Sequence, residues 1–309
     1  MKFGIQHAVG DPRWTPAILA PDAVARFARA AEQVGFDAIA FTDHPAPSAA
    51  WVDNGGEGVA DPIAGLAFCA ALTTTMRLLT FVLVPAYRNP FLAAHQLATV
   101  DVLSGGRLTV ALGTGYLFGE FRALGADPGS RLAAFDEGVE LMLAAWSGAD
   151  VSHERGPIVA KRTRVLPLPS QHPHPPLWIH GNSTFGVERA GRYADGWLGM
   201  MTHDNEAMVR TTRTRPLPDV ATVARRVDEV RTAAVAAGRD PAAVEIVVTG
   251  VWPMLDVRAG RSADAYLADV AALEAVGVDW IVSLCCGDDV AAAQDTVARF
   301  GEDVITASR

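Results

Sequence analysis

Three short stretches of this chain combine residue types that could do chemistry together. Asp43 and His44 place a carboxylate beside an imidazole, whose pKa lies near the working pH of most enzymes, so this pair could give or take a proton. Gly113-Thr114-Gly115 leaves a flat stretch of backbone against which a planar ring could lie. An Asp-His pair is also compatible with a loop histidine held by its neighbour, so the pair alone leaves both roles open.

The third stretch, Gly181-Asn182-Ser183, comes directly before a predicted helix. Small residues and hydroxyl groups at that place leave backbone N–H groups and the positive end of the helix dipole free, which favours a phosphate. A planar ring and a phosphate together describe a flavin-like nucleotide. The sequence therefore predicts a nucleotide cofactor beside a group that transfers a proton.

Strand and helix patterns alternate along the chain and put all three stretches where predicted strands end. The predicted strands end at His7, Thr42, Val84, Leu112, His180, Met200, Val251 and Cys285. Eight such units in about 300 residues predict an α/β fold, the (β/α)8 TIM barrel, in which functional residues lie at the carboxyl ends of the strands. A doubly wound sheet stays open as an alternative, because periodicity does not reveal strand order.

Residues 147–175 interrupt this alternation with short β-like pieces, one of them Pro157–Ala160, and a Pro- and His-rich segment. We interpret them as an insertion with a small hairpin before strand five, within a single domain that spans residues 1–309. His172 and His174 lie in this insertion, but no further ligand follows at a suitable spacing, so we predict no metal site.

A second irregular segment, Ala46–Asp61, follows the Asp-His pair and is rich in Gly, Pro and Asp. It contains Trp51 and Gly55-Gly56. Loops of this length inside a compact fold are commonly functional lids. We therefore expect it to cover a substrate.

Composition narrows the class of protein. The net charge of −9 argues against a nucleic-acid or anionic-membrane surface. Three cysteines make no disulfide framework and fit a reducing compartment. The first residues lack the apolar core of a signal peptide, and no apolar run reaches membrane-spanning length. We expect a cytoplasmic protein without nucleic-acid or membrane partners.

Longer segments resemble a known family. Residues 90–125 (PFLAAHQLATVDVLSGGRLTVALGTGYLFGEFRALG) and 175–200 (PPLWIHGNSTFGVERAGRYADGWLGM) are similar to the two signatures of the bacterial luciferase-like flavin and deazaflavin oxidoreductases. MKFGIQH and GFDAIAFTDHP resemble the start of their barrel. The resemblance implies a TIM barrel with an insertion before strand five, a bound FMN or coenzyme F420 (a deazaflavin), a small-molecule substrate and a homodimer.

The resemblance also implies a role for each matching position. It implies that Asp43 and His44 transfer a proton. It implies that Phe81 and Val82 form a strand-three bulge with a non-prolyl cis peptide, which supports the ring. The ring would contact Gly113, Thr114 and Gly115, and the phosphate would bind Gly181, Asn182 and Ser183. One departure concerns Tyr116, which stands where sugar-phosphate dehydrogenases of the superfamily have a carboxylate; Glu120 is the nearest acidic residue along the chain.

We favour an F420-dependent oxidoreductase that transfers a hydride between the reduced cofactor and an unknown small organic substrate. The Asp-His pair and the Ala-, Arg- and Gly-rich composition both point to the deazaflavin branch. One alternative is an FMN-dependent monooxygenase, which uses oxygen and a partner flavin reductase. Another is a barrel that binds flavin without catalysis. A metal-dependent hydrolase would carry an H-x-H motif on strand one, where this chain has only His7.

Overall fold

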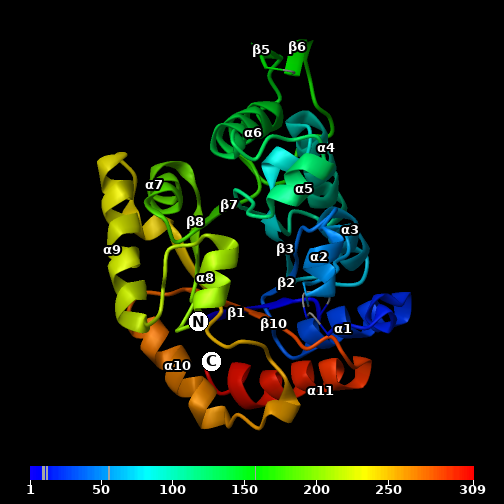
Figure 1. Cartoon of the computed structure of the whole chain (residues 1–309), viewed down its shortest axis with the longest axis vertical. Coiled ribbons are helices and arrows are strands. Elements are labelled where there is room, and N and C mark those ends of the chain that lie inside the picture. Colours follow the sequence, from blue (N-terminus) through cyan, green and yellow to red (C-terminus); the bar gives the residue numbers. More distant parts are fainter. Residues whose placement is uncertain (9–10, 12, 55, 157) are drawn as a thin grey trace.

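Eight parallel strands close into a barrel in this computed structural model, which describes residues 1–8, 11, 13–54, 56–156 and 158–309 (Figure 1). The strands are β1 (Lys2–Gln6), β2 (Ala38–Phe41), β3 (Arg77–Leu83), β4 (Leu108–Leu112), β7 (Leu177–His180), β8 (Gly196–Met200), β9 (Glu245–Thr249) and β10 (Trp280–Leu284). Strand β1 pairs with both β2 and β10, so the sheet has no edge. This closure confirms the predicted TIM barrel and excludes the doubly wound sheet.

The strands are apolar on both faces because both faces are buried. Their inward side chains form a small core of their own inside the barrel, in which Trp178 and Trp280 pack edge to face at 5.3 Å. Gly196 makes room for this pair, since a Cβ there would lie 2.4 Å from Trp178 Cδ1. The outward side chains belong to a larger core shared with the surrounding helices.

Helices cover the outside of the barrel (Figure 1). They are α1 (Pro21–Gln33), α2 (Ala49–Asp53), α3 (Pro62–Ala70), α4 (Pro90–Leu103), α5 (Phe118–Ala123), α6 (Arg131–Trp146), α7 (Thr184–Tyr193), α8 (Glu206–Thr212), α9 (Val220–Ala236), α10 (Ala263–Ala275) and α11 (Val290–Phe300). Single helical turns are η2 (Pro16–Leu19), η3 (Pro85–Tyr87), η4 (Pro241–Ala243), η5 (Val257–Ala259) and η6 (Gly301–Ile305). No helix of the described residues has the length and apolar character that crossing a membrane requires.

Three short helices differ from the sequence interpretation. The segment 46–61, interpreted as an irregular loop, carries α2, and the short helices α5 and α8 were not predicted. Helices of five to seven residues complete at most two turns, so they show too little periodicity to be recognised. The N-terminus of α2 is nevertheless capped locally, because Ser48 Oγ accepts a hydrogen bond from the Trp51 N–H.

The insertion before the fifth barrel strand is confirmed. It forms an antiparallel hairpin of β5 (Val151–Arg155) and β6 (Ile158–Thr163), which projects beyond α4 and α6 at one end of the molecule (Figure 1). His153 Nε2 lies 2.7 Å from Glu137 Oε1 of α6 and ties the hairpin to that helix. Pro157, the first residue of the second predicted β-piece, lies outside the described residues.

Candidate active site

His44 lies just beyond the carboxyl end of β2 and is surrounded by three groups from other segments. Its Nδ1 lies 3.2 Å from Oε2 of Glu120 in α5. Its Nε2 lies 3.3 Å from the Tyr116 hydroxyl and 3.4 Å from Oε1 of Glu57. These groups come from the β4–α5 segment and the segment after α2, so tertiary folding assembles a cluster that the sequence scatters over 77 positions.

Glu120 fixes the orientation of the His44 ring. Its carboxylate is completely buried and accepts hydrogen bonds from the Tyr87 hydroxyl at 3.0 Å and from the Ala46 N–H at 3.0 Å. The third bond, to Nδ1 of His44, then requires Nδ1–H as the donor. A histidine held in this way has Nε2 left for proton exchange, the arrangement used in catalytic triads.

The charges around His44 favour its protonated form. Burial by itself lowers the pKa of His44, but the hydrogen bond to Glu120 and the charges of Glu57, Glu120 and Asp43 together raise the pKa above its ordinary value. Burial also raises the pKa of the Tyr116 hydroxyl, and both glutamates add to that shift. Tyr116 is therefore a hydrogen-bonding neutral phenol next to an imidazole that readily gains a proton.

Asp43, the other member of the predicted pair, is not the carboxylate that holds His44. It is fully buried and forms a bidentate ion pair with Arg88, with N···O distances of 2.6 and 2.8 Å. It also accepts the Val84 N–H at 2.9 Å. These bonds tie the end of β2 to η3 beyond β3, and they leave Asp43 acting on His44 through its charge.

The predicted ring floor is contiguous in the structure. The Phe81–Val82 peptide is cis, and the β3–β4 register shifts between Thr80 and Leu83, as the resemblance implied. A Cβ on Gly113 of the neighbouring strand end would lie 2.6 Å from Val82 Cγ2. The backbone at the end of β4 therefore lies directly against the Val82 side chain at the end of β3.

The rest of the Gly-Thr-Gly stretch leads from this floor to His44. Gly115 has φ +71°, a conformation that favours glycine, and a Cβ there would lie 2.8 Å from the Phe121 ring. Half-buried Thr114 lies between the two glycines. The turn places the Tyr116 hydroxyl 3.3 Å from His44 Nε2, so the segment that begins at Gly113 also contacts His44.

His180, at the end of the fifth barrel strand β7, lies beside Gly113. Its Cδ2 would lie 3.9 Å from a Cβ on Gly113, and its Nδ1 lies 3.1 Å from the carbonyl oxygen of Leu198. Burial lowers the pKa of His180. His7, by contrast, packs between the rings of Phe27 and Phe41, away from this floor.

The predicted phosphate stretch leads into the N-terminus of α7. Asn182 is fully buried, and its side chain bonds both Met200 backbone groups and the Arg215 carbonyl, so it fastens the loop after β7 to the end of β8 and to the segment after α8. Gly181 has φ +143°. Ser183 is exposed and is the N-cap of α7, and among the described residues its hydroxyl makes no capping hydrogen bond. The helix end and this hydroxyl are both available to a ligand.

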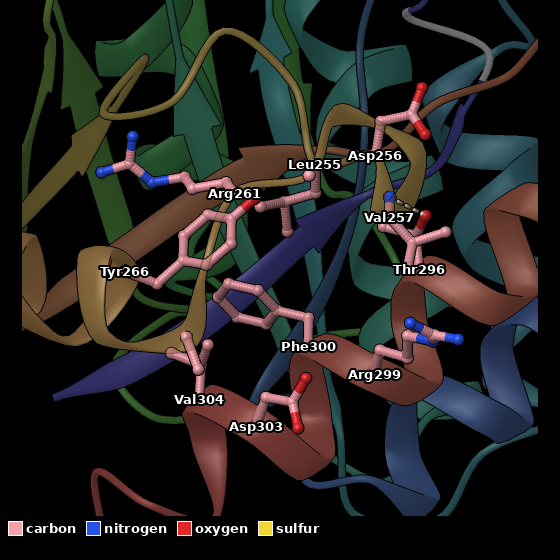
Figure 2. Close-up of a pocket in the computed structure, with 12 residues that line it drawn as sticks. Leu255, Asp256, Val257, Arg261, Tyr266, Thr296, Arg299, Phe300, Asp303 and Val304 are labelled. Carbon is pink, nitrogen blue, oxygen red and sulfur yellow. Dashed lines mark hydrogen bonds between the residues drawn. The ribbon is translucent and has the colours of Figure 1, made fainter.

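A cavity of about 190 Å³ lies outside the barrel between η5, α10 and α11 (Figure 2). Tyr266 and Phe300 line it, and the Val257 N–H donates to Thr296 Oγ1 at its edge. None of the residues predicted to be functional lines it. The candidate active site is therefore the cluster at the strand ends, and this cavity lies apart from it.

Asp256, Cys286 and Asp288 lie close enough together to be considered as metal ligands. Arg258 already pairs with both carboxylates, at 2.7 and 2.6 Å, and supplies the positive charge that a cation would bring. The prediction that the chain holds no metal stays a prediction.

The strand pairing and the register shift in β3 define an α/β barrel of eight parallel strands with a bulged third strand. The chain belongs to the luciferase-like monooxygenase family, whose sequence profile matches residues 1–275. It is 29% identical over 189 residues to the F420-dependent hydroxymycolic acid dehydrogenase of Mycobacterium tuberculosis, covering 60% of this chain and 51% of that protein. It is 32% identical over 172 residues to an F420-dependent glucose-6-phosphate dehydrogenase of Beutenbergia cavernae, covering 54% of this chain and 49% of that protein.

These matches span about half the length of the curated relatives. Among solved structures, the monooxygenase RslO1 from Streptomyces bottropensis superposes with a TM-score of 0.82 at 23% identity, over the whole of both chains. At that level of identity the similarity concerns the fold.

Proposed function

We propose that this chain is an F420-dependent oxidoreductase that transfers a hydride to or from a small organic substrate. The observation that carries the proposal is the position of His44. Its Nδ1 is held by Glu120, and its Nε2 faces Tyr116 at the end of the turn that begins with the ring floor. The F420 dependence of two relatives, each matched over about half its length, supports the choice of cofactor.

The residues at the strand ends fit a planar ring attached to a phosphate. Gly113 beside Val82 keeps the floor flat, and the open N-terminus of α7 with Ser183 is suited to an anion. We propose that the phosphate takes Ser183 and backbone N–H groups of Gly181 and Asn182, because the Asn182 side chain is already engaged. When bound there, F420 would supply the hydride.

The protein supplies the proton. His44 Nε2 gives a proton to an oxygen of a carbonyl substrate, or takes one from an alcohol in the reverse direction. Glu120 keeps the ring in the required orientation, and the Tyr116 hydroxyl can hydrogen-bond the same oxygen. We propose that Asp43 positions this end of β2 through its pair with Arg88 and does not itself exchange a proton.

The polar groups at Nε2 also bear on the class of substrate. They are a carboxylate, Glu57, and a phenol, Tyr116, and the indole of Trp51 lies 6.1 Å from the Tyr116 ring. Neither Glu57 nor Tyr116 carries a positive charge that would bind a phosphate, whereas aromatic rings accept an apolar compound. We therefore propose a neutral alcohol or carbonyl compound in preference to a sugar phosphate.

A titration of the purified protein tests the cofactor. We expect added F420 to bind with a change in its absorbance and fluorescence, and FMN at the same concentrations to bind much more weakly. Tight binding of FMN together with indifference to F420 would contradict the proposal and favour the monooxygenase alternative, for which a flavin reductase partner would be required.

Replacement of Gly113 by valine tests the floor. The new side chain would overlap Val82 and, in the proposed site, compete with the ring for the same space, so F420 affinity should fall roughly 10–100-fold, about 1.4–2.8 kcal/mol. The matched control is Gly119→Ala, whose Cβ would meet only Ser48 at 3.9 Å. Unchanged F420 affinity in a folded Gly113→Val protein would contradict the proposal that the ring lies against Gly113.

We propose in addition that the protein works as a homodimer, as the family resemblance implies, and in the cytoplasm, which its three cysteines favour. Sedimentation equilibrium of the purified chain measures whether it forms a homodimer.

A further inference from the structure

We propose that Glu57 is the positioning residue through which His44 exchanges its proton with solvent. The inference rests on the proposed function, in which each turnover leaves His44 one proton short or one in excess. That proton must be replaced or removed before the next turnover. His44 itself is nearly enclosed, with 8% of its side chain exposed, so a group that reaches both the imidazole and water is required.

The other neighbours of His44 are poorly suited to this task. Glu120 is fully buried and already accepts hydrogen bonds from Tyr87 and Ala46. Asp43 is occupied by Arg88. Tyr116 is a phenol whose burial makes it a still weaker acid than usual, because its pKa is raised.

Glu57 combines the two properties. Its Oε1 lies 3.4 Å from His44 Nε2, while 22% of its side chain remains exposed. Desolvation raises the pKa of Glu57 to about 7, with the charges of Asp11 and Glu120 adding to the rise and His44 opposing it. A carboxyl group with that pKa both donates and accepts protons readily near neutral pH.

The backbone around Glu57 holds it in place. Gly56 packs against the Trp51 indole so closely that a Cβ would lie 2.2 Å from Nε1, and Gly58 packs against Trp14, where a Cβ would lie 3.0 Å from Cζ2. Each neighbour of Glu57 is thus a glycine set on a tryptophan ring. Gly55, the other half of the Gly-Gly pair, lies outside the described residues.

The step is a simple proton transfer. In the direction of carbonyl reduction, His44 loses its Nε2 proton to the substrate oxygen, the Glu57 carboxyl passes its own proton to Nε2, and the Glu57 carboxylate then takes a proton from water or buffer. Oxidation of an alcohol runs the same transfers in reverse. No further reactant takes part.

The test begins with the full chain free of cofactor. The titratable and charged groups that face His44 and Glu57 from the packed segments are Asp11, Asp43, Tyr87, Arg88, Tyr116 and Glu120. Glu57→Gln alters none of these. NMR titration of the histidine rings, with His44 assigned by a His44→Gln variant, should show the His44 midpoint moving to lower pH in Glu57→Gln. Asp53→Asn, which removes an exposed charge from the helix just before Glu57, should leave the midpoint in place.

The second measurement is turnover of the F420-loaded enzyme. Glu57→Ala should slow turnover by roughly 10²-fold, and formate or imidazole in the buffer should restore it in proportion to its concentration. A purely structural role for Glu57 would not respond to buffer. An unmoved His44 midpoint, or the absence of rescue, would overturn the proposal. Failure of the wild-type protein to use F420 would instead contradict the proposed function, and the NMR shift would still report on the coupling of Glu57 to His44.

Discussion

Replacing His44 with alanine should slow hydride transfer by about 10²–10⁴-fold, the usual contribution of a positioned general acid or base. The loss follows because, in our proposal, Glu57 exchanges its proton with the substrate only through the His44 imidazole, and neither Glu120 nor Tyr116 is suited to replace that ring. Glu120 would face the empty space left by the ring, and Tyr116 has a pKa raised by burial and by two glutamates. Turnover should be measured by the absorbance of F420 with an alcohol or carbonyl substrate at saturating cofactor.

The matched control for this experiment is His95→Ala. His95 lies on α4 outside the barrel, where its Nδ1 lies 2.9 Å from the Leu166 carbonyl oxygen. We expect its replacement to leave turnover unchanged. The affinity of His44→Ala for F420 should stay within a few-fold of the wild type, since the ring floor is built from other residues. Wild-type turnover by a folded His44→Ala protein would remove His44 from proton transfer.

Replacing Asp43 with alanine should lower the free energy of unfolding by about 3–5 kcal/mol, the range measured when one member of a buried ion pair is removed. Arg88, with only 14% of its side chain exposed, would lose a bidentate partner at 2.6 and 2.8 Å. The Val84 N–H would lose its acceptor as well. Urea denaturation followed by circular dichroism measures the change.

An exposed pair provides the comparison. Asp150 pairs with Arg164 on the hairpin at 2.5 Å, and its replacement by alanine should change stability little, because solvent screens such pairs. The double variant Asp43→Ala, Arg88→Ala should recover part of the loss, since it leaves no uncompensated charge. A loss of turnover in Asp43→Ala without any loss of stability would contradict the positioning role and return Asp43 to the chemistry.

Much of the fold follows from local patterns. Apolar runs such as Leu108–Leu112 predict strands buried on both faces, and eight of them alternating with helices predict a barrel. Because the carboxyl ends of parallel strands gather at one face, the sequence also places Asp43-His44, Gly113-Thr114-Gly115 and Gly181-Asn182-Ser183 on the same rim. The cis peptide after Phe81 was predicted through the family resemblance, and the structure confirms it.

The partners of these residues were not predictable in the same way. Glu120 lies 76 positions from His44, and Arg88 lies 45 positions from Asp43. Because Asp43 precedes His44 in the sequence, it was a candidate to hold the imidazole. The Asp43 carboxylate instead bonds Val84 and Arg88, the residues on either side of η3. Phosphate binding by Asn182 stays a prediction, and the tertiary structure adds that its side chain bonds Met200 and Arg215.

The sequence by itself thus determined which strands form, which residues stand at their ends, and that the candidate residue His44 and the Gly113-Thr114-Gly115 turn share one rim. Only the tertiary structure decided that Glu120 orients His44, that Arg88 pairs with Asp43, and that Glu57 lies beside Nε2 of His44. The physical reason is that strand and helix periods act over a few residues, whereas buried hydrogen bonds and ion pairs select partners by distance in space. A short helix and a loop, α5 and the segment after α2, carry the two glutamates, and neither has a period that a sequence can display.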